Sequence, residues 1–186
     1  MIRSEHAALA AVLRAMSMII ERGPEPQAQH FFDALRAMLF YLDEFPERHH
    51  HPNESDHLFP RLARLAPELM PVIRRLENDH ANGESRVRQL QHLLAGWEFI
   101  GASRRQAFVE AARDYERFYL EHMRIEETQL LPVAAKLFAE DDWKELDAAC
   151  AASLDPLAGG QRDPSYDALF SRIVLKTPAP FGVGGI

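Results

Sequence analysis

Cysteine is almost absent from this sequence. Cys150 is the single cysteine in 186 residues, so the chain can form no internal disulfide. It also lacks the cysteine clusters that hold structural zinc or iron–sulphur centres. Any bound metal must therefore be held by histidine and carboxylate side chains.

Concentrated positive charge and long apolar runs are missing as well. The net charge is -7 and lysine and arginine form no cluster, which argues against nucleic acid or an anionic membrane as a partner. No apolar run approaches the roughly 20 residues that cross a bilayer. Residues 1–6 lack the basic and apolar regions of a signal peptide. We therefore expect a cytoplasmic protein that binds neither nucleic acid nor a membrane.

The chain does have strong hydrophobic periodicity. Four long segments carry apolar residues at alternating spacings of three and four, the pattern of helices packed against other helices. The first begins at Ile2. The second contains Pro46, Pro52 and Pro60, each of which removes a backbone donor, so we expect a kinked helix that reaches about Leu65.

The third and fourth segments are separated by a glycine-containing connection. The third opens at Pro67 and ends by Gly101. Ser103 and Gln106 have the spacing of a capping box, which predicts the start of the fourth helix. The buried face of that helix is expected to extend to Gln129.

Short connections between four long helices predict one all-α domain, an up-down-up-down four-helix bundle over residues 1–140. Residues 141–186 contain two shorter amphipathic patterns, around Trp143–Cys150 and Tyr166–Val174. We expect this region to be a short helical C-terminal extension that packs on the same domain.

One short pattern occurs twice within the predicted bundle. His50 precedes Glu54 by four residues, and His122 precedes Glu126 by four residues. Positions i and i+4 lie on one face of a helix, so each pair directs an imidazole and a carboxylate to one point. A proline ends an apolar triplet six residues after each glutamate.

One more histidine precedes each copy of the pattern. His6 lies 44 residues before His50, His80 lies 42 residues before His122, and both fall on the apolar faces of their helices. Burying four imidazoles and two carboxylates without a cation would be costly. Nitrogen and carboxylate donors suit iron, manganese or zinc. The arrangement predicts two metal ions bridged by Glu54 and Glu126, with positions left open for a small ligand.

The duplicated pattern, the two isolated histidines and the apolar-proline triplets together resemble the hemerythrin-like (HHE cation-binding) family over about residues 1–140. The resemblance implies a four-helix bundle with a non-haem di-iron centre. It implies two iron ions bridged by carboxylates and by an oxo or hydroxo group, with zinc or manganese as substitutes. The implied metal ligands are His6, His50, Glu54, His80, His122 and Glu126.

The chain departs from the oxygen-carrying members of that family, which use a fifth histidine one turn away on the third helix. Here the positions four residues either side of His80 are Leu76 and Glu84. The carriers also place the last carboxylate five residues after its histidine, whereas this chain offers Glu126 at four and Glu127 at five. The chain is more similar to the bacterial di-iron repair and sensing proteins.

Several nearby residues have open roles. His49, His51 and His57 are interpreted as surface or outer groups, one of which could replace His50 as the partner of Glu54. Glu84 is either solvated or a further ligand. Glu127 is interpreted as an acceptor that orients a histidine N–H.

The resemblance implies a protein that binds or senses oxygen or nitric oxide in oxidative or nitrosative stress. The alternatives are a di-iron enzyme that consumes peroxide or reduces nitric oxide, an iron donor for repair of iron centres, and a bundle with structural zinc. A redox partner or an iron acceptor would then be required. No general acid or nucleophilic dyad is evident outside the predicted metal ligands, which favours binding over catalysis.

Overall fold

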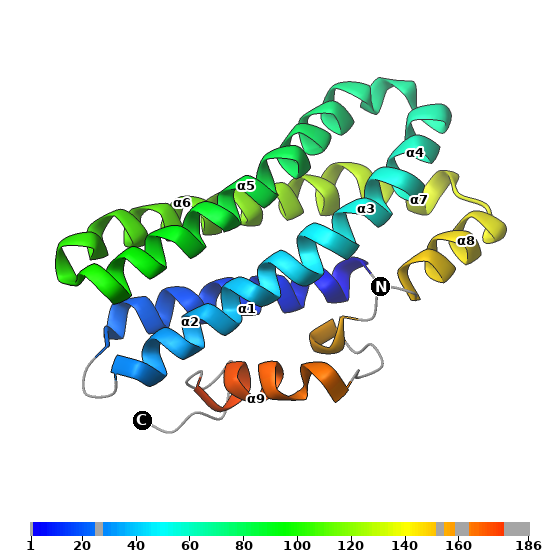
Figure 1. Ribbon diagram of the computed structural model, residues 1–186. Helices are drawn as coiled ribbons and strands as arrows, with labels where there is room; N and C mark the ends of the chain where they lie inside the picture. The colour runs from blue at the N-terminus through cyan, green and yellow to red at the C-terminus, as the bar shows by residue number, and fades with distance from the viewer. Residues whose placement is uncertain (1, 25–27, 152–154, 159–163, 177–186) are drawn as a thin grey trace.

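The computed structural model describes residues 2–24, 28–151, 155–158 and 164–176, and every regular element in them is helical. The all-α prediction is therefore confirmed. Four long helical runs lie side by side in alternating directions, and shorter helices cover one end and one side of them (Figure 1). Among the residues described, no helix has an apolar stretch long enough to cross a bilayer.

The first long run is α1 (Ile2–Arg22) and the third is α5 (Met70–Ile100). The second run is continuous but irregular, as predicted from its prolines. Its segments are α2 (Ala28–Leu42), η1 (Asp43–His50), α3 (His51–Asn53), η2 (Glu54–Leu58) and α4 (Phe59–Leu65). The fourth run consists of α6 (Arg105–Ile125), η5 (Glu126–Leu130) and α7 (Leu131–Leu137).

Three of these segments, η1, η2 and η5, are π-helical. The N–H of Phe59 bonds to the carbonyl of Glu54, and the N–H of Leu131 bonds to that of Glu126, five residues back in each case. A proline directly follows each of these donors. Proline has no N–H to donate, and in a regular α-helix its ring would clash with the carbonyl four residues back. Each motif glutamate therefore begins a widened turn.

The widened turn explains one wrong prediction. Gln129 was expected on the buried face of the fourth run, but it is exposed, while Leu130 is buried in its place. A π-helical turn accommodates one extra residue, so the helix face shifts by one position after Glu126. The seven-residue spacing from His122 therefore no longer marks the inner face.

The predicted capping box is also wrong. Ser103 lies inside the 3₁₀ turn η4 (Ala102–Arg104), and neither η4 nor α6 has a side-chain cap. The N–H of Arg104 bonds to the carbonyl of Gly101 at 3.0 Å, and Gln106 donates to Glu110 on the next turn. The connection between η3 (Pro67–Leu69) and the start of α5 likewise has no side-chain cap.

The bundle core forms two apolar clusters with a polar layer between them. On α1, Ile2 belongs to one cluster and Leu9 to the other, with His6 between. On α5, Leu76 and Val87 are divided in the same way. The helices thus surround the predicted metal ligands with dry, closely packed side chains on both sides.

The C-terminal helices pack against the bundle where they are described. Helix α8 (Glu140–Ala151) lies at one end, where Trp143 contacts Phe138 with ring centroids 5.1 Å apart. Helix α9 (Asp167–Lys176) lies along α2, and Ile173 joins the larger apolar cluster (Figure 1). Two 3₁₀ turns, η6 (Pro156–Ala158) and η7 (Pro164–Tyr166), precede α9. The division of the chain near residue 140 stays a prediction.

Candidate metal centre

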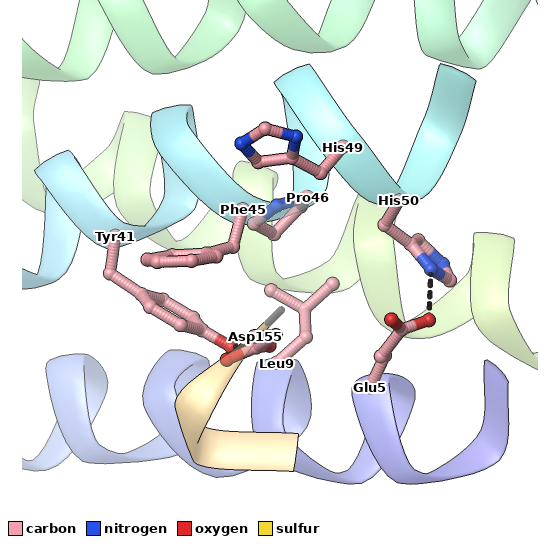
Figure 2. A pocket seen from close by; sticks show the side chains of 8 residues that line it. All are labelled: Glu5, Leu9, Tyr41, Phe45, Pro46, His49, His50 and Asp155. Carbon is pink, nitrogen blue, oxygen red and sulfur yellow. Dashed lines mark hydrogen bonds and ion pairs between the residues drawn. The ribbon is translucent and has the colours of Figure 1, made fainter. Parts of the chain in front are cut away.

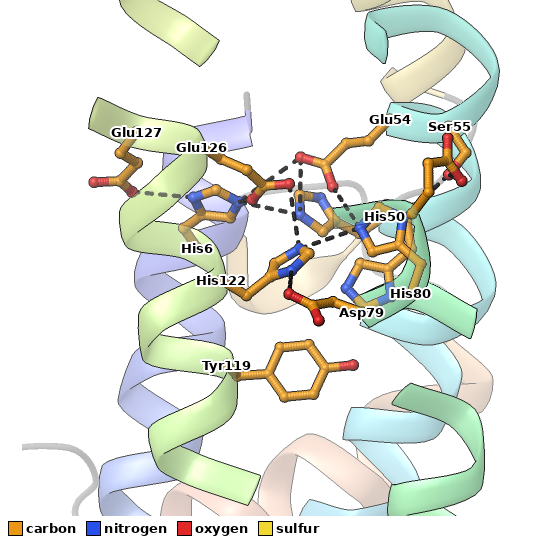
Figure 3. A network of polar contacts seen from close by, with 12 residues as sticks. His6, His50, Glu54, Ser55, Asp79, His80, Tyr119, His122, Glu126 and Glu127 are labelled. Carbon is orange, nitrogen blue, oxygen red and sulfur yellow. Dashed lines mark hydrogen bonds and ion pairs between the residues drawn. The ribbon is translucent and has the colours of Figure 1, made fainter. Parts of the chain in front are cut away.

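The six predicted ligands meet in the middle of the bundle, and each of the four long runs contributes to them (Figure 3). Glu54 and Glu126 are 1% and 0% exposed, the most deeply buried acids in the described chain. His6, His50 and His122 are also buried, and His80 is partly buried. Sequence spacing therefore predicted the residues that converge here.

The four histidines form two pairs. The Nε2 atoms of His6 and His50 are 3.2 Å apart, and those of His80 and His122 are 3.1 Å apart. Both members of the first pair come from the N-terminal half of the bundle and both members of the second pair from the C-terminal half. Imidazole nitrogens converge in this way when they share a cation or a proton.

Glu54 lies between the two histidine pairs. Its Oε1 is 3.4 Å from Nε2 of His50, and its Oε2 is 3.5 Å from Nε2 of His80. Each oxygen therefore faces a different pair.

Glu126 repeats this arrangement from the fourth run. Its Oε2 is 3.2 Å from Nε2 of His6, and its Oε1 is 3.2 Å from Nε2 of His122. Two carboxylates that divide their oxygens between two nitrogen pairs have the arrangement needed to bridge two cations.

The four oxygens of Glu54 and Glu126 are buried and accept no well-formed hydrogen bond from any described residue. Their distances to the imidazoles are ion-pair distances without hydrogen-bond geometry. Buried carboxylate oxygens are normally satisfied, because leaving them unpaired is costly. Cations placed between the histidine pairs would satisfy all four, so these residues fit a two-metal site.

The electrostatics of the cluster favour a positive charge at its centre. Burial opposes protonation of His6, but Glu126 and Glu54 outweigh it and raise the pKa of His6 to about 10. Burial also opposes protonation of His50, but Glu54 and Glu5 outweigh it and raise the pKa of His50. The pKa of His122 is raised against burial by Glu126 and Glu54. Without metal, protons on the imidazoles balance the two carboxylates.

The glutamates respond in the opposite direction. Burial would raise the pKa of Glu54, but the neighbouring His50, His6 and His80 hold it well below its usual value. The pKa of Glu126 is also lowered, since His122 and His6 outweigh burial and the repulsion of Glu54. Both carboxylates are therefore ionised and ready to bind cations.

A second layer of polar groups orients two of the histidines. Glu5, on α1, contacts Nδ1 of His50 at 2.9 Å, as Figure 2 shows. Asp79, on α5, lies 3.5 Å from Nδ1 of His122. Glu5 and Asp79 each directly precede an isolated histidine in the sequence, but each contacts the histidine of a His-x-x-x-Glu motif instead. Carboxylates in this position fix the tautomer and leave Nε2 free for a metal.

The isolated histidines are oriented by residues that follow the motif glutamates. Nδ1 of His6 is 3.0 Å from Glu127, which confirms the role expected for that acid. Nδ1 of His80 is 3.0 Å from the Ser55 hydroxyl, which in turn donates to Glu77. The two halves of the bundle thus use equivalent positions for equivalent tasks.

The other residues with open roles fall into two groups. His57 is exposed, Glu84 is exposed and pairs with Arg88, and His49 lies beside Phe45, so none of the three faces the cluster. His51 was interpreted as a surface or outer group, and its assignment to the surface is wrong. It is buried, and one of its ring nitrogens groups with those of His80 and His122.

Sequence reasoning missed His51 because only its neighbour His50 has the i, i+4 spacing to Glu54. A signal was nevertheless present: Glu47 stands four residues before His51, and their side chains meet at 3.2 Å. The pKa of His51 lies well below its usual value. Burial is the largest cause, and the charges of His80 and His50 lower it further.

The comparison with protein families agrees with this geometry. Residues 1–134 match the family described as the hemerythrin HHE cation binding domain. The chain belongs to that family. No curated protein and no solved structure matches it. This hemerythrin-like chain is accordingly a metal-binding helical bundle, and its histidine and glutamate clusters can hold metal cations.

Proposed function

We propose that this hemerythrin-like chain is a non-haem di-iron protein that binds or senses oxygen or nitric oxide in oxidative or nitrosative stress. The observation that carries the proposal is the division of the oxygens of Glu54 and Glu126 between two histidine pairs, with no hydrogen bond to any of these oxygens from the residues that the structure describes. Nitrogen and carboxylate oxygen are the donors that iron accepts, and the clustered ligands are all histidines and glutamates.

The ligands proposed for the first ion are His6 and His50, and those for the second are His80 and His122. Glu54 and Glu126 would bridge them. These side chains supply fewer donor atoms than two six-coordinate ions require, which leaves room for an exogenous ligand. When bound, the iron pair supplies a redox-active centre at which a diatomic molecule binds.

The protein's own residues prepare the site for that ligand. The apolar clusters on both sides keep bulk water from the centre. Glu5, Asp79 and Glu127 hold the imidazoles in one tautomer. A dry site with fixed donors keeps the open metal positions for a small ligand rather than bulk water.

The proposal is tested by metal analysis and optical spectroscopy of the iron-loaded protein. We expect two irons per chain, and anaerobic reduction followed by exposure to oxygen or nitric oxide should produce new charge-transfer bands in the visible and near-ultraviolet. Full iron loading with unchanged spectra under both gases would contradict it.

Replacement of the bridging carboxylates tests the assignment of ligands. Glu54→Ala or Glu126→Ala should lower the stoichiometry below two ions per chain, since each variant removes a ligand of both ions. Glu84→Ala is the matched control, because Glu84 is an exposed acid on α5. Retention of two tightly bound ions in both bridge variants would show that the wrong carboxylates had been chosen.

The same preparations distinguish the alternative functions. Consumption of many equivalents of peroxide or nitric oxide per iron pair would identify an enzyme. Release of iron to an apo-acceptor protein would identify an iron donor. Zinc retained after growth in iron-rich medium would identify a structural site.

A further inference from the structure

His51 lies against the half of the cluster formed by His80 and His122. The residue is 3% exposed. Its ring stacks on that of His80, with centroids 4.2 Å apart and planes inclined by 13°, and its centroid is 5.6 Å from that of His122. One nitrogen from each of these three histidines lies within 4.8 Å of the others. Three convergent imidazoles are a common ligand set for a divalent metal.

A carboxylate orients His51 through its Nδ1 atom, as carboxylates do for other histidines of the cluster. Its Nδ1 is 3.2 Å from Glu47, four residues earlier on the same run. Glu47 in turn accepts hydrogen bonds from the hydroxyls of Tyr115, at 3.4 Å, and Tyr119. A carboxylate on one ring nitrogen leaves the opposite nitrogen available, which is the usual arrangement of a metal-binding histidine.

Gly83 provides the space for this support. A Cβ at position 83 would collide with the carboxylate of Glu47 and the hydroxyl of Tyr119. Glycine within a helix costs about 1 kcal/mol relative to alanine. Its presence one turn after His80 therefore has a local explanation, which is the close approach of Glu47 and Tyr119 to α5.

The two halves of the bundle differ at this position. A shift of 72 residues relates His50 to His122 and Glu54 to Glu126, and it relates His51 to Met123. Every other member of the cluster has a counterpart of similar function, but His51 has none. The additional imidazole is thus confined to one metal position.

We propose that His51 is a third histidine ligand of the ion bound by His80 and His122, oriented by Glu47, Tyr115 and Tyr119. The inference rests on the proposed two-metal centre. It makes the two ions chemically different, since one has two imidazoles and the other has three.

The first experiment counts metal-bound histidines in the unmodified protein. The zinc-loaded chain, labelled with ¹⁵N-histidine, gives separate signals for metal-bound and protonated ring nitrogens in long-range proton–nitrogen correlation spectra. Five histidines with metal-bound nitrogen support the inference, and four with His51 unbound overturn it. Fewer than two zinc ions per chain would instead overturn the two-metal proposal, so the two failures are distinguishable.

The second experiment measures the affinity for each ion by competition with a chelator. His51→Ala should leave one site unchanged and weaken the other by at least about 10–100-fold, the loss usually caused by disturbing even an outer partner of a ligand. Added imidazole should restore part of the loss. His49→Ala is the control, since the His49 ring lies beside Phe45. Wild-type affinity at both sites in His51→Ala would refute the assignment.

A third variant separates ligation from packing. Gly83→Ala keeps His51 but displaces Glu47 and Tyr119, so it should weaken the same site, by less than His51→Ala does. Its folding can be checked by circular dichroism before titration. A loss of equal size at both sites would show that the region acts by general packing and would count against the inference.

Discussion

At the scale of single residues, neighbours in the sequence contact partners on different helices of the centre. Glu5 and His6 are adjacent in the sequence, yet Glu5 serves His50 and His6 is served by Glu127. Adjacent residues on a helix point in directions about 100° apart, so they cannot serve each other. Each neighbour therefore reaches a different helix, and the interior of the bundle is linked across its whole width.

The raised pKa of His6 predicts how the metal-free protein responds to pH. Its pKa is about 10 in the folded chain and 6.5 as the unperturbed value, so the folded state holds the proton more tightly. The resulting stabilisation is complete below about pH 6.5 and is lost as the pH rises through about 10. The free energy of unfolding of the metal-free protein, measured with urea, should fall over that range.

Metal loading should abolish this decline, because the cations replace the imidazole protons. His6→Gln should reduce it, while His92→Gln, an exposed histidine on α5, should leave it unchanged. A metal-free protein whose stability is constant from pH 6.5 to 10 would show that His6 is not protonated in the folded state.

At the scale of elements, the widened turns after Glu54 and Glu126 set the direction of the ligands. Both arise where a proline directly after the apolar pair prevents a normal α-helical hydrogen bond. The carbonyl of each motif glutamate therefore accepts its hydrogen bond from the N–H five residues later, instead of four. The backbone of the motif is locked in a shape that a regular helix does not have.

Pro60→Ala tests this role of the widened turn. Pro60 is exposed, so the substitution removes little packing and allows η2 to close into a regular α-helix. We expect helix content to be retained and metal affinity to fall about tenfold or more, as when other outer constraints on ligands are lost. Circular dichroism and chelator competition measure the two quantities.

Pro71→Ala is the matched control for Pro60→Ala. Pro71 is also exposed, but it stands in the first turn of α5, where its missing N–H costs no hydrogen bond. It should change neither quantity. Equal metal affinity in wild type and Pro60→Ala would show that the widened turn is not needed for the site.

Much of this architecture was predictable from periodicity, and two of the failures, at Gln129 and His51, share one cause. His6 and His122 were placed correctly because they lie in regular helix, where a spacing of three or four fixes the face. Gln129 and His51 were misplaced because each is in or beside a π-helical segment. Proline indicates where a helix deviates, but not how far its face is rotated.

At the scale of the whole molecule, the C-terminal extension is tied to the bundle close to the metal centre. Asp155 enters a pocket that is also lined by Glu5 and His50, as Figure 2 shows. There it accepts a hydrogen bond of 2.7 Å from the hydroxyl of Tyr41. Farther along, the hydroxyl of Tyr166 donates to Glu44 at 2.8 Å.

Tyr41→Phe should therefore destabilise the protein while leaving the ligands in place. Both Tyr41 and Asp155 are buried, so loss of the donor leaves a buried carboxyl group short of a partner, at a cost of about 1–3 kcal/mol. The measurement is the free energy of unfolding in urea. Tyr166→Phe, at a partly buried site, should cost less. Equal stability of Tyr41→Phe and wild type would contradict this account of the attachment.

The repetition of the site across the two halves has a consequence for how the centre is assembled. Each half carries an acid, an isolated histidine, a second histidine and one glutamate in the same order. Within each half the two histidines already converge, while the glutamate reaches across to the other half. Each glutamate also faces a histidine of its own half, so neither helix pair holds a complete site by itself. The two metal positions are therefore completed only when the halves pack together, so folding of the bundle and assembly of the centre are one event.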